Sequence, residues 1–345
     1  MTKKQIKRIL RIVFIIASIT SLFFVPWVIV RAWITPLPET VQEQVNDAIG
    51  YELDGMIVYI DEAGKPPAFY TAGWKNRETK VPADPQSLFK IASIGKLYIA
   101  VAFAKLANDK RLSLDETLAH YFPELVGRIE NAKKITLRMM LQHRSGIPNL
   151  TDNPDFPWND PPKSSREALE YALDQPANFE PDAKYGYSNT NYLLLSEIID
   201  KVVGYSHYRY IKEKILMPLH LKNTFGSFHD VDLTDMVSGY SVGYDGDLKT
   251  QDLGSMVATA EDVGIFLRAL NDGSLFDKGE QEIYSSIYVY EHTGLVPGYS
   301  SIARYYKDID TVVIQFVSTS GGYTWNVTEI VYNRIVKIRR SKKSS

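Results

Sequence analysis

The stretch LFKIASIGK at residues 88–96 decides how the chain is interpreted, together with the apolar run LYIAVAFA at residues 97–104. Ser93 and Lys96 stand three residues apart, so on a helix they share one face, one turn from each other. The apolar run predicts that this helix is buried. Burial disfavours the charged form of an amine, and a neutral lysine beside a hydroxyl can activate a serine as a nucleophile. The alternative is that Lys96 reaches water from the first helical turn.

Composition excludes several classes of function. The chain of 345 residues has no cysteine, which rules out disulfides, thiolate catalysis and cysteine-ligated metals. Its six histidines are scattered, without a His-x-x-x-His pair, so the sequence predicts no metal site. Residues 1–33 carry six basic and no acidic residues, whereas the remainder has 33 basic and 41 acidic ones, a net charge of −8. A mildly acidic body argues against nucleic acid as the partner.

The N-terminal region predicts a membrane anchor. Residues 12–30 form an uncharged run of 19 residues, long enough to cross a bilayer. The basic cluster before it favours a cytoplasmic N-terminus, which places the rest of the chain outside. Pro26 is tolerable in a membrane helix, and a cleaved signal peptide is the alternative. We therefore expect residues 1–33 to be a basic segment and single-pass signal-anchor, followed by a linker and first helix at 34–50.

The remaining chain predicts an α/β (α+β) fold in which distant segments form one antiparallel sheet. Residues 55–60 and 68–74 are typical of a hairpin, and residues 301–306 and 311–318 of a second one. The pattern between the hairpins is mostly helical, which predicts an all-helical insertion at about 105–235 beside the sheet and its flanking helices. The expected helices cover residues 41–49, 168–173, 191–203, 208–216, 259–270 and 328–338. We expect the catalytic domain at 51–338 and a frayed basic tail at 339–345.

Two further motifs carry chemistry. Tyr187-Ser188-Asn189 offers a phenol that shuttles a proton when cations depress its pKa, and an amide that can hold a lysine amine and a substrate carbonyl. Its alternative is a helix cap with a packed aromatic ring. In residues 290–301, Gly294 predicts close backbone approach, here of substrate. Leu295 N–H on an edge strand could then form an oxyanion hole with Ser93 N–H, although an ordinary turn is the alternative.

Together the three motifs resemble the serine β-lactamase and penicillin-binding protein superfamily, in its class C β-lactamase and DD-peptidase branch. That family carries Ser-x-x-Lys, Tyr-x-Asn and Lys/His-Thr-Gly in this order, and here they begin at 93, 187 and 292. Similar satellite segments lie at 135–148, 194–199, 217–219 and 254–262. The resemblance covers about residues 50–338. Its Phe-x-Ile-Ala-Ser-x-x-Lys frame selects Ser93 and Lys96 over Ser87 and Lys90, which have the same spacing.

The resemblance implies a beta-lactamase/transpeptidase-like fold and a two-step acyl transfer without cofactor or metal. Ser93 would be the acylated nucleophile, and Lys96 and Tyr187 would move its proton. The residues implied in substrate binding are Asn189, His292, Thr293, Gly294 and Leu295.

The resemblance also implies the substrate class. His292 stands where strong class C β-lactamases usually have lysine, and a histidine is at best partly charged at neutral pH. This favours a serine hydrolase at the outer face of a bacterial cell membrane, acting on D-alanyl peptide or ester bonds of the cell envelope, with β-lactams as covalent ligands. The alternatives are a β-lactamase, or a non-catalytic penicillin-binding sensor. The loops at about 152–162 and 245–252 are expected to set the preference.

One rival motif lies elsewhere. Residues 239–243 match Gly-x-Ser-x-Gly, and Asp262 and His292 follow in the order of an α/β-hydrolase triad. That motif needs a helix directly after the serine, whereas Tyr-Asp-Gly-Asp follows here, which predicts a turn. The sequence therefore favours Ser93 over Ser241.

Overall fold

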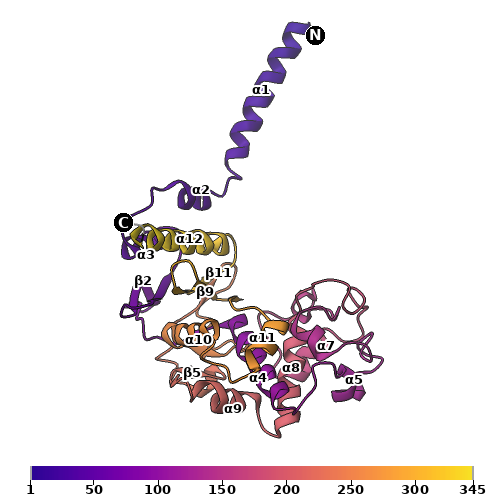
Figure 1. Ribbon diagram of the computed structural model, residues 1–345. Coiled ribbons are helices and arrows are strands. Elements are labelled where there is room, and N and C mark those ends of the chain that lie inside the picture. Colours follow the sequence, from indigo (N-terminus) through magenta and orange to yellow (C-terminus); the bar gives the residue numbers. More distant parts are fainter. Residues whose placement is uncertain (1, 344–345) are drawn as a thin grey trace.

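The computed structural model describes residues 2–343, and its centre is a six-stranded antiparallel sheet (Figure 1). Both predicted hairpins are present in it: the first pairs β1 with β2 and the second pairs β9 with β10. β1 and β10, which come from opposite ends of the chain, lie side by side and join the two hairpins. The strands, in their order across the sheet, are β3 (Val81–Pro82), β2 (Ala68–Asn76), β1 (Gly55–Glu62), β10 (Thr311–Val317), β9 (Tyr299–Tyr306) and β8 (His292–Val296).

The alternation of side chains on β1 explains why both faces of the sheet are covered. Met56, Val58 and Ile60 pack into the cluster formed with α3 (Val41–Ile49) and α12 (Thr324–Lys343). Side chains at the odd positions between them point to the opposite face, where α4 and α10 contribute to a larger cluster. Figure 1 shows α3 and α12 on one side of the sheet and α10 on the other. Such a doubly covered strand must be apolar at every position, as β1 nearly is.

Helices predominate between α4 and the second hairpin. The helix predicted to end at Gly204 does so, with Gly204 in the left-handed conformation that favours glycine. Two small sheets lie outside the central one. The first has three strands in the order β4 (Phe89–Lys90), β7 (Val257–Ala258) and β5 (Thr224–Phe225). The second pairs β11 (Thr319–Ser320) with β6 (Tyr240–Ser241). The helices of this region are α4 (Gly95–Asn108), α5 (Leu118–Tyr121), α6 (Leu137–Leu141), α7 (Ser165–Glu170), α8 (Asn189–Val203), α9 (His207–Ile211), α10 (Ala260–Asp272) and α11 (Glu280–Ile287). The short η segments are η1 (Ala92–Ile94), η2 (Pro123–Leu125), η3 (Leu150–Asp152), η4 (Lys212–Leu216) and η5 (Phe228–Asp230).

The prediction of a frayed tail from residue 339 onward is wrong for the described residues. α12 continues to Lys343 instead of ending at Ile338. Arg339 pairs with Glu62 at the end of β1, and Arg340 pairs with Asp308 at 2.8 Å. These ion pairs hold the last turns of the helix on the body. The final part of the predicted tail, residues 344–345, lies outside the described residues.

The prediction of one continuous membrane helix over residues 12–30 is also wrong. The apolar run is divided between α1 (Lys3–Leu22) and α2 (Trp27–Ile34), which meet at 75°. Pro26 caps α2; having no N–H to donate, it cannot continue the hydrogen-bond ladder of α1. Among residues 2–343, no helix alone has the length and apolarity to cross a bilayer, and α1 and α2 meet that requirement only as a bent pair.

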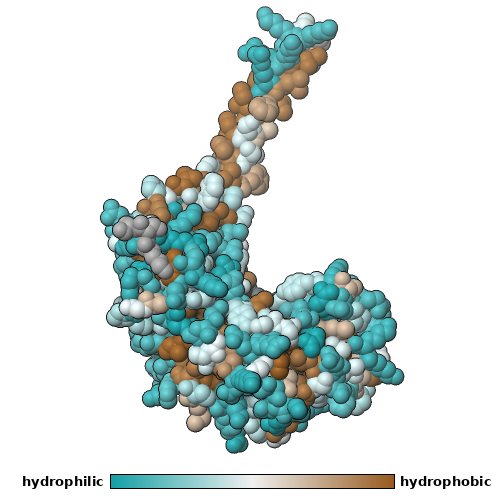
Figure 2. All heavy atoms as spheres, in the orientation of Figure 1, coloured by the Kyte–Doolittle hydropathy of each residue, from teal (hydrophilic) through white to brown (hydrophobic). Residues whose placement is uncertain are grey.

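The two N-terminal helices have different surroundings. α1 stands out from the body, with an apolar shaft and a polar tip (Figure 2). α2 packs on the body instead, with Ala32 fully buried and Val28 and Ile29 against the cluster of α3 and α12. Arg334 of α12 holds the chain that follows α2, because its guanidinium donates to the carbonyl oxygens of Thr35 and Pro36 at 2.7 and 2.6 Å.

Candidate active site

Ser93 lies on η1, at the junction of the central sheet and the buried helix α4. As predicted, α4 is buried on nearly all sides. Two hydrogen bonds to the neighbouring loop hold the chain just before Ser93: Ile91 N–H donates to Met256 O at 3.0 Å and Ala92 N–H donates to Ser255 Oγ at 2.9 Å. Ala92 has φ of +50°, a left-handed conformation that costs a residue with a Cβ free energy. Strained backbone thus immediately precedes the candidate nucleophile.

Lys96 lies beside Ser93 and is almost wholly buried. Its Nζ donates to Ser93 Oγ at 3.0 Å and to Asn189 Oδ1 at 2.8 Å. The residue is 9% exposed, and burial lowers the pKa of Lys96 to about 7. A large fraction of this amine is therefore neutral near pH 7. The expected pairing of a buried amine with a serine hydroxyl is present.

Asn189 enters the site from the first turn of α8. Ser188 occupies the N-cap, which leaves the Asn189 side chain free to accept from Lys96. Two residues outside the predicted set hold Asn189: its backbone N–H donates to Asn149 Oδ1 at 2.9 Å, and its Nδ2 donates to Thr151 Oγ1 at 3.0 Å. The interpretation of Asn189 as only a helix cap is therefore wrong.

Tyr187 completes the contact with the nucleophile but not in the expected protonation state. Its hydroxyl lies 2.8 Å from Ser93 Oγ. Burial raises the pKa of Tyr187 to about 12, although its hydrogen bond with Ser93 acts in the opposite direction. The expectation that cations depress this pKa is wrong for the free protein, because desolvation outweighs every favourable contact. Tyr187 is a neutral phenol at pH 7.

His143 is a site residue that the motif search missed. Its ring stacks on the Tyr187 ring with centroids 4.5 Å apart, and its Nδ1 accepts from Ser188 N–H at 3.2 Å. Burial, aided by the charge of Lys96, lowers the pKa of His143 to about 3, so the ring is neutral. His143 lies in the segment at 135–148 that resembles the β-lactamase and penicillin-binding protein superfamily. That resemblance is the feature of the sequence from which its place at the site could have been predicted.

His292 is neutral and held in one tautomer. Its Nδ1 lies 2.5 Å from the carbonyl oxygen of Thr293, which can only accept, so this nitrogen carries the hydrogen. The other nitrogen, Nε2, then accepts from the Tyr288 hydroxyl at 2.9 Å. Burial lowers the pKa of His292 to about 4. The ring therefore offers no positive charge to a carboxylate near pH 7.

Gly294 has a different close neighbour from the one expected. A Cβ there would lie 2.4 Å from the carbonyl oxygen of Ile91 and 3.1 Å from Ala92 Cβ. The glycine therefore allows β8 to lie against η1, and the backbone it approaches is that of the segment carrying Ser93, not a substrate. Its neighbour Leu295 is 53% exposed on the outermost strand and lines the cleft. The role of Leu295 N–H in an oxyanion hole stays a prediction.

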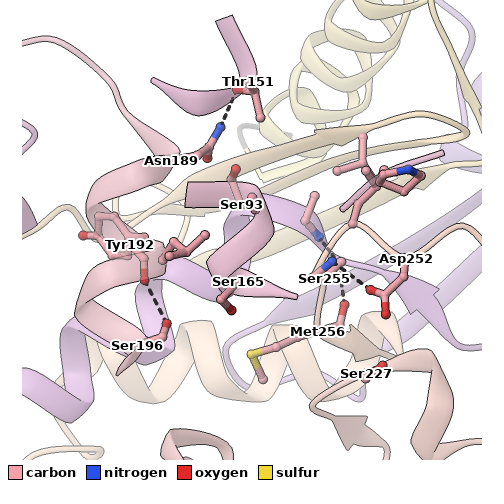
Figure 3. A pocket seen from close by; sticks show the side chains of 18 of the residues that line it. Ser93, Thr151, Ser165, Asn189, Tyr192, Ser196, Ser227, Asp252, Ser255 and Met256 are labelled. Carbon is pink, nitrogen blue, oxygen red and sulfur yellow. Dashed lines mark hydrogen bonds between the residues drawn. The ribbon is translucent and has the colours of Figure 1, made fainter. Parts of the chain in front are cut away.

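Ser93, Lys96, Asn189 and Leu295 line a cleft of about 550 Å³, part of which is seen in Figure 3. Ser93, Asn189 and Thr151 lie together there, with Asp252, Ser255 and Met256 across the cleft from Tyr192 and Ser196. Within residues 2–343, no group of three or more histidine, aspartate or glutamate side chains is arranged to hold a metal ion.

The structure does not assemble the rival triad. Asp262 accepts from Asn223 N–H at 2.8 Å and from Thr224 Oγ1 at 2.9 Å. Ser241 bonds to Ser320 instead. The second Ser-x-x-Lys pair is also structural, because the buried Lys90 donates to the carbonyl oxygens of residues 248 and 251 at 3.2 and 2.5 Å.

Comparisons with known proteins agree with this geometry. A family model described as "Beta-lactamase" matches residues 30–286. Protein flp from Staphylococcus aureus (strain N315) is 29% identical over 198 residues, covering 55% of this chain. Penicillin-binding protein 4* from Bacillus subtilis (strain 168) is 26% identical over 166 residues, covering 47% of this chain. The matched stretches span only 39% and 36% of those relatives' own lengths.

Solved structures show the same fold. The D-amino acid amidase from Ochrobactrum anthropi SV3, complexed with D-phenylalanine, superposes with a TM-score of 0.77 at 21% identity, covering 88% of this chain and 98% of that one. At this identity the likeness concerns the fold alone. The antiparallel sheet with helices on both faces is therefore that of the β-lactamase-like α+β proteins, as predicted.

Proposed function

Because the chain belongs to the β-lactamase family of serine hydrolases, we propose that it hydrolyses D-alanyl peptide or ester bonds of the bacterial cell envelope through an acyl-enzyme on Ser93. The observation that carries this proposal is the buried Lys96 amine, 3.0 Å from Ser93 Oγ, with a pKa of about 7. An amine that is largely neutral at working pH can accept the serine proton as the hydroxyl attacks.

The proposed reaction has two steps. In the first, Lys96 takes the Ser93 proton while Oγ bonds to the substrate carbonyl carbon, and the C–N or C–O bond then breaks. The proton on Lys96 then passes by way of the Tyr187 hydroxyl, which lies 2.8 Å from Oγ and is neutral at pH 7, to the leaving amine or alkoxide, so that Lys96 and Tyr187 are both neutral again. In the second, water attacks the carbonyl carbon of the ester, Lys96 takes a water proton and returns it to Ser93 Oγ as the C–O bond breaks, and the acid leaves. Asn189 holds the Lys96 amine in place throughout.

The neutral His292 supports an ester substrate over a β-lactam or a peptide with a free C-terminus. A β-lactam antibiotic and a peptide C-terminus both present a carboxylate, and the neutral ring offers it no charge, while its one N–H already donates to the Thr293 carbonyl oxygen. A D-alanyl ester has no such carboxylate, so it does not need a cation at this position. The penicillin-binding protein among the relatives supports an envelope substrate.

We place the enzyme at the outer face of the membrane, anchored by α1 and α2. The exposed apolar shaft of α1 supports insertion of this helix. α2 has an apolar outer face, on which Trp33 and Ile34 are 75% and 66% exposed, while its inner face packs on the body. Tryptophan at such a position is typical of a membrane–water interface. In this proposal α2 lies in the interface instead of continuing a straight span.

Covalent labelling tests the proposed nucleophile. Fluorescent penicillin and a fluorophosphonate should each label the full chain, and Ser93→Ala should lose both labels. Ser87→Ala is the matched control, because Ser87 belongs to the second Ser-x-x-Lys pair and is buried. A label that persists in Ser93→Ala would contradict the proposal.

Turnover separates the remaining alternatives. A hydrolase releases its acyl group repeatedly from D-alanyl substrates, whereas a penicillin-binding sensor stays acylated after one event. Rapid nitrocefin hydrolysis with inert D-alanyl substrates would identify a β-lactamase instead.

A further inference from the structure

The cleft extends well past the reactive serine, along one face of α8. Asn189, Leu193 and Ser196 line it at successive turns, and since an α-helix rises 1.5 Å per residue, they span about 10 Å. Beyond Ser196 the lining continues through Tyr208 and Ile211 of α9. We call this extension, from Asn189 to Ile211, the long arm of the cleft.

Hydrocarbon forms most of the long arm's walls. Ile99 of α4 and Leu193 of α8 line it on the helical side, and Met256 lines it from the segment after the 245–252 loop. Phe156 and Trp158 contribute aromatic rings from the chain between η3 and α7, with their centroids 4.9 Å apart and edge to face. Such a surface binds apolar groups by removing them from water.

Two hydroxyl groups along the long arm, those of Ser196 and Tyr208, already have partners within the protein. Ser196 Oγ donates to the Tyr192 carbonyl oxygen at 2.9 Å, a bond drawn in Figure 3. The Tyr208 hydroxyl donates to the Thr224 carbonyl oxygen, also at 2.9 Å. Both hydroxyl groups therefore keep their hydrogen bonds when an apolar ligand displaces water from the arm. Burying them under hydrocarbon costs no hydrogen bond and so little free energy.

The position of Tyr187 indicates which part of the substrate enters the arm. The leaving group must lie within reach of the phenol that protonates it. Among the described residues, Asn189 and Ser93 line the cleft, whereas Tyr187 does not. The leaving group therefore lies on the Tyr187 side of Ser93, and the acyl group extends from Ser93 into the long arm.

We propose that the long arm binds an aliphatic acyl chain, so that the enzyme also hydrolyses esters or amides of medium-length fatty acyl groups. This proposal rests on the proposed Ser93 acyl-enzyme and extends its acyl groups from D-alanyl to longer, apolar ones. A D-alanyl group carries a single methyl, which leaves most of a cleft of about 550 Å³ unfilled. Each methylene that moves from water to an apolar wall is expected to raise kcat/KM about fourfold at most.

A series of p-nitrophenyl esters tests this with the full chain. The acyl group runs from acetyl through butyryl, hexanoyl and octanoyl to decanoyl, while the leaving group stays the same. We expect kcat/KM to rise by about two- to fourfold per methylene until the arm is full. A reciprocal series, with acetyl esters of alcohols of increasing length, should show no comparable rise.

Leu193→Trp should shorten the accepted chain, because the larger ring fills the arm near its start. The decanoyl-to-acetyl ratio of kcat/KM should fall at least tenfold relative to wild type. Met217→Trp is the matched control, since Met217 is exposed outside the cleft and the ratio should not change. If Leu193→Trp does not fold, Ser196→Phe, one turn farther along, should lower the same ratio.

The outcomes separate this proposal from the proposed function. A wild-type profile that is flat or falls from acetyl onward, in a protein that turns over the acetyl ester, overturns the apolar arm alone. A rise that appears only with longer alcohols overturns the acyl assignment. An equal loss for every ester in Leu193→Trp also counts against it. Absence of both ester turnover and Ser93 labelling would instead contradict the acyl-enzyme.

Discussion

Among single residues, burial sets the protonation states of the site. It lowers the pKa of Lys96 to about 7 and that of His292 to about 4, and it raises the pKa of Tyr187 to about 12. The cause is the same in each case, because a low-dielectric environment penalises whichever form is charged. Lys96 is therefore the group of this set that titrates near neutral pH.

The rate of acylation should follow the titration of Lys96. Below about pH 7 the amine is protonated and cannot accept the Ser93 proton, so the rate should fall as pH decreases and level off above that value. Labelling rates with fluorescent penicillin, measured between about pH 5 and pH 9 with folding checked at each pH, give the profile. A rate that still rises up to about pH 9 without levelling off would show that Lys96 is charged at neutral pH and would contradict this prediction.

His143 should act by positioning Tyr187. His143→Ala removes the ring stacked on Tyr187 and the acceptor of Ser188 N–H, so acylation should slow by about ten- to a hundredfold. His143→Phe restores a stacking ring and should recover part of the rate, which a purely destabilising change would not do. His220→Ala is the control, because His220 also has a positive φ but is exposed. Wild-type labelling by His143→Ala would contradict this role.

Between elements, the contact of β8 with η1 connects the outer strand to the nucleophile. β8 pairs with β9 along its length, and Gly294 lets its backbone approach Ile91 and Ala92. The same short segment of chain is held on its other side by Ser255 and Met256. Ser93 is thus positioned by two elements that are distant in sequence.

Gly294→Ala should disturb both stability and acylation. The added Cβ would lie 2.3 Å from Ser301 Oγ and 2.4 Å from Ile91 O, so β8 or η1 must move. We expect a loss of about 1–3 kcal/mol in the free energy of unfolding, and a larger fractional loss of labelling than of folded protein. Gly50→Ala is the control, because its nearest contact is Asp47 O at 3.2 Å. An equally stable and active Gly294→Ala would show that β8 does not constrain η1.

At the scale of the whole molecule, α3 and α12 cover one face of the sheet, with α2 packed on α12, and α10 covers the other face (Figure 1). Arg334 holds the segment after α2, through Thr35 and Pro36, directly on α12. If α2 lies in a membrane interface, the body is therefore held against the bilayer by its α12 side.

Cysteine labelling tests the membrane contact, because the chain has no cysteine of its own. The full chain is reconstituted in vesicles of phosphatidylglycerol and phosphatidylcholine, with an environment-sensitive fluorophore at Ile34→Cys or, as control, at Lys65→Cys in the β1–β2 turn. We expect brominated lipids to quench the first probe and not the second. Equal access of both probes to a water-soluble quencher would contradict an interfacial α2.

Local pattern alone was enough to predict both hairpins, the helix at 41–49 and the end of α8 at Gly204, since alternation, helical spacing and glycine act within a few residues. The Ser-x-x-Lys spacing by itself left two candidate pairs, and the family frame around the first motif selected Ser93 and Lys96. The order of the three motifs along the chain predicted that Tyr187 joins Ser93 and Lys96 at the site. Its hydroxyl lies 2.8 Å from Ser93 Oγ.

Tertiary structure decided what depends on neighbours distant in the chain. The raised pKa of Tyr187 and the place of His143 follow from burial among several elements. The neighbour of Gly294 is η1, about two hundred residues away in sequence, and ion pairs with Glu62 and Asp308 extend α12. Desolvation and packing arise only when distant segments meet, so no local pattern contains them.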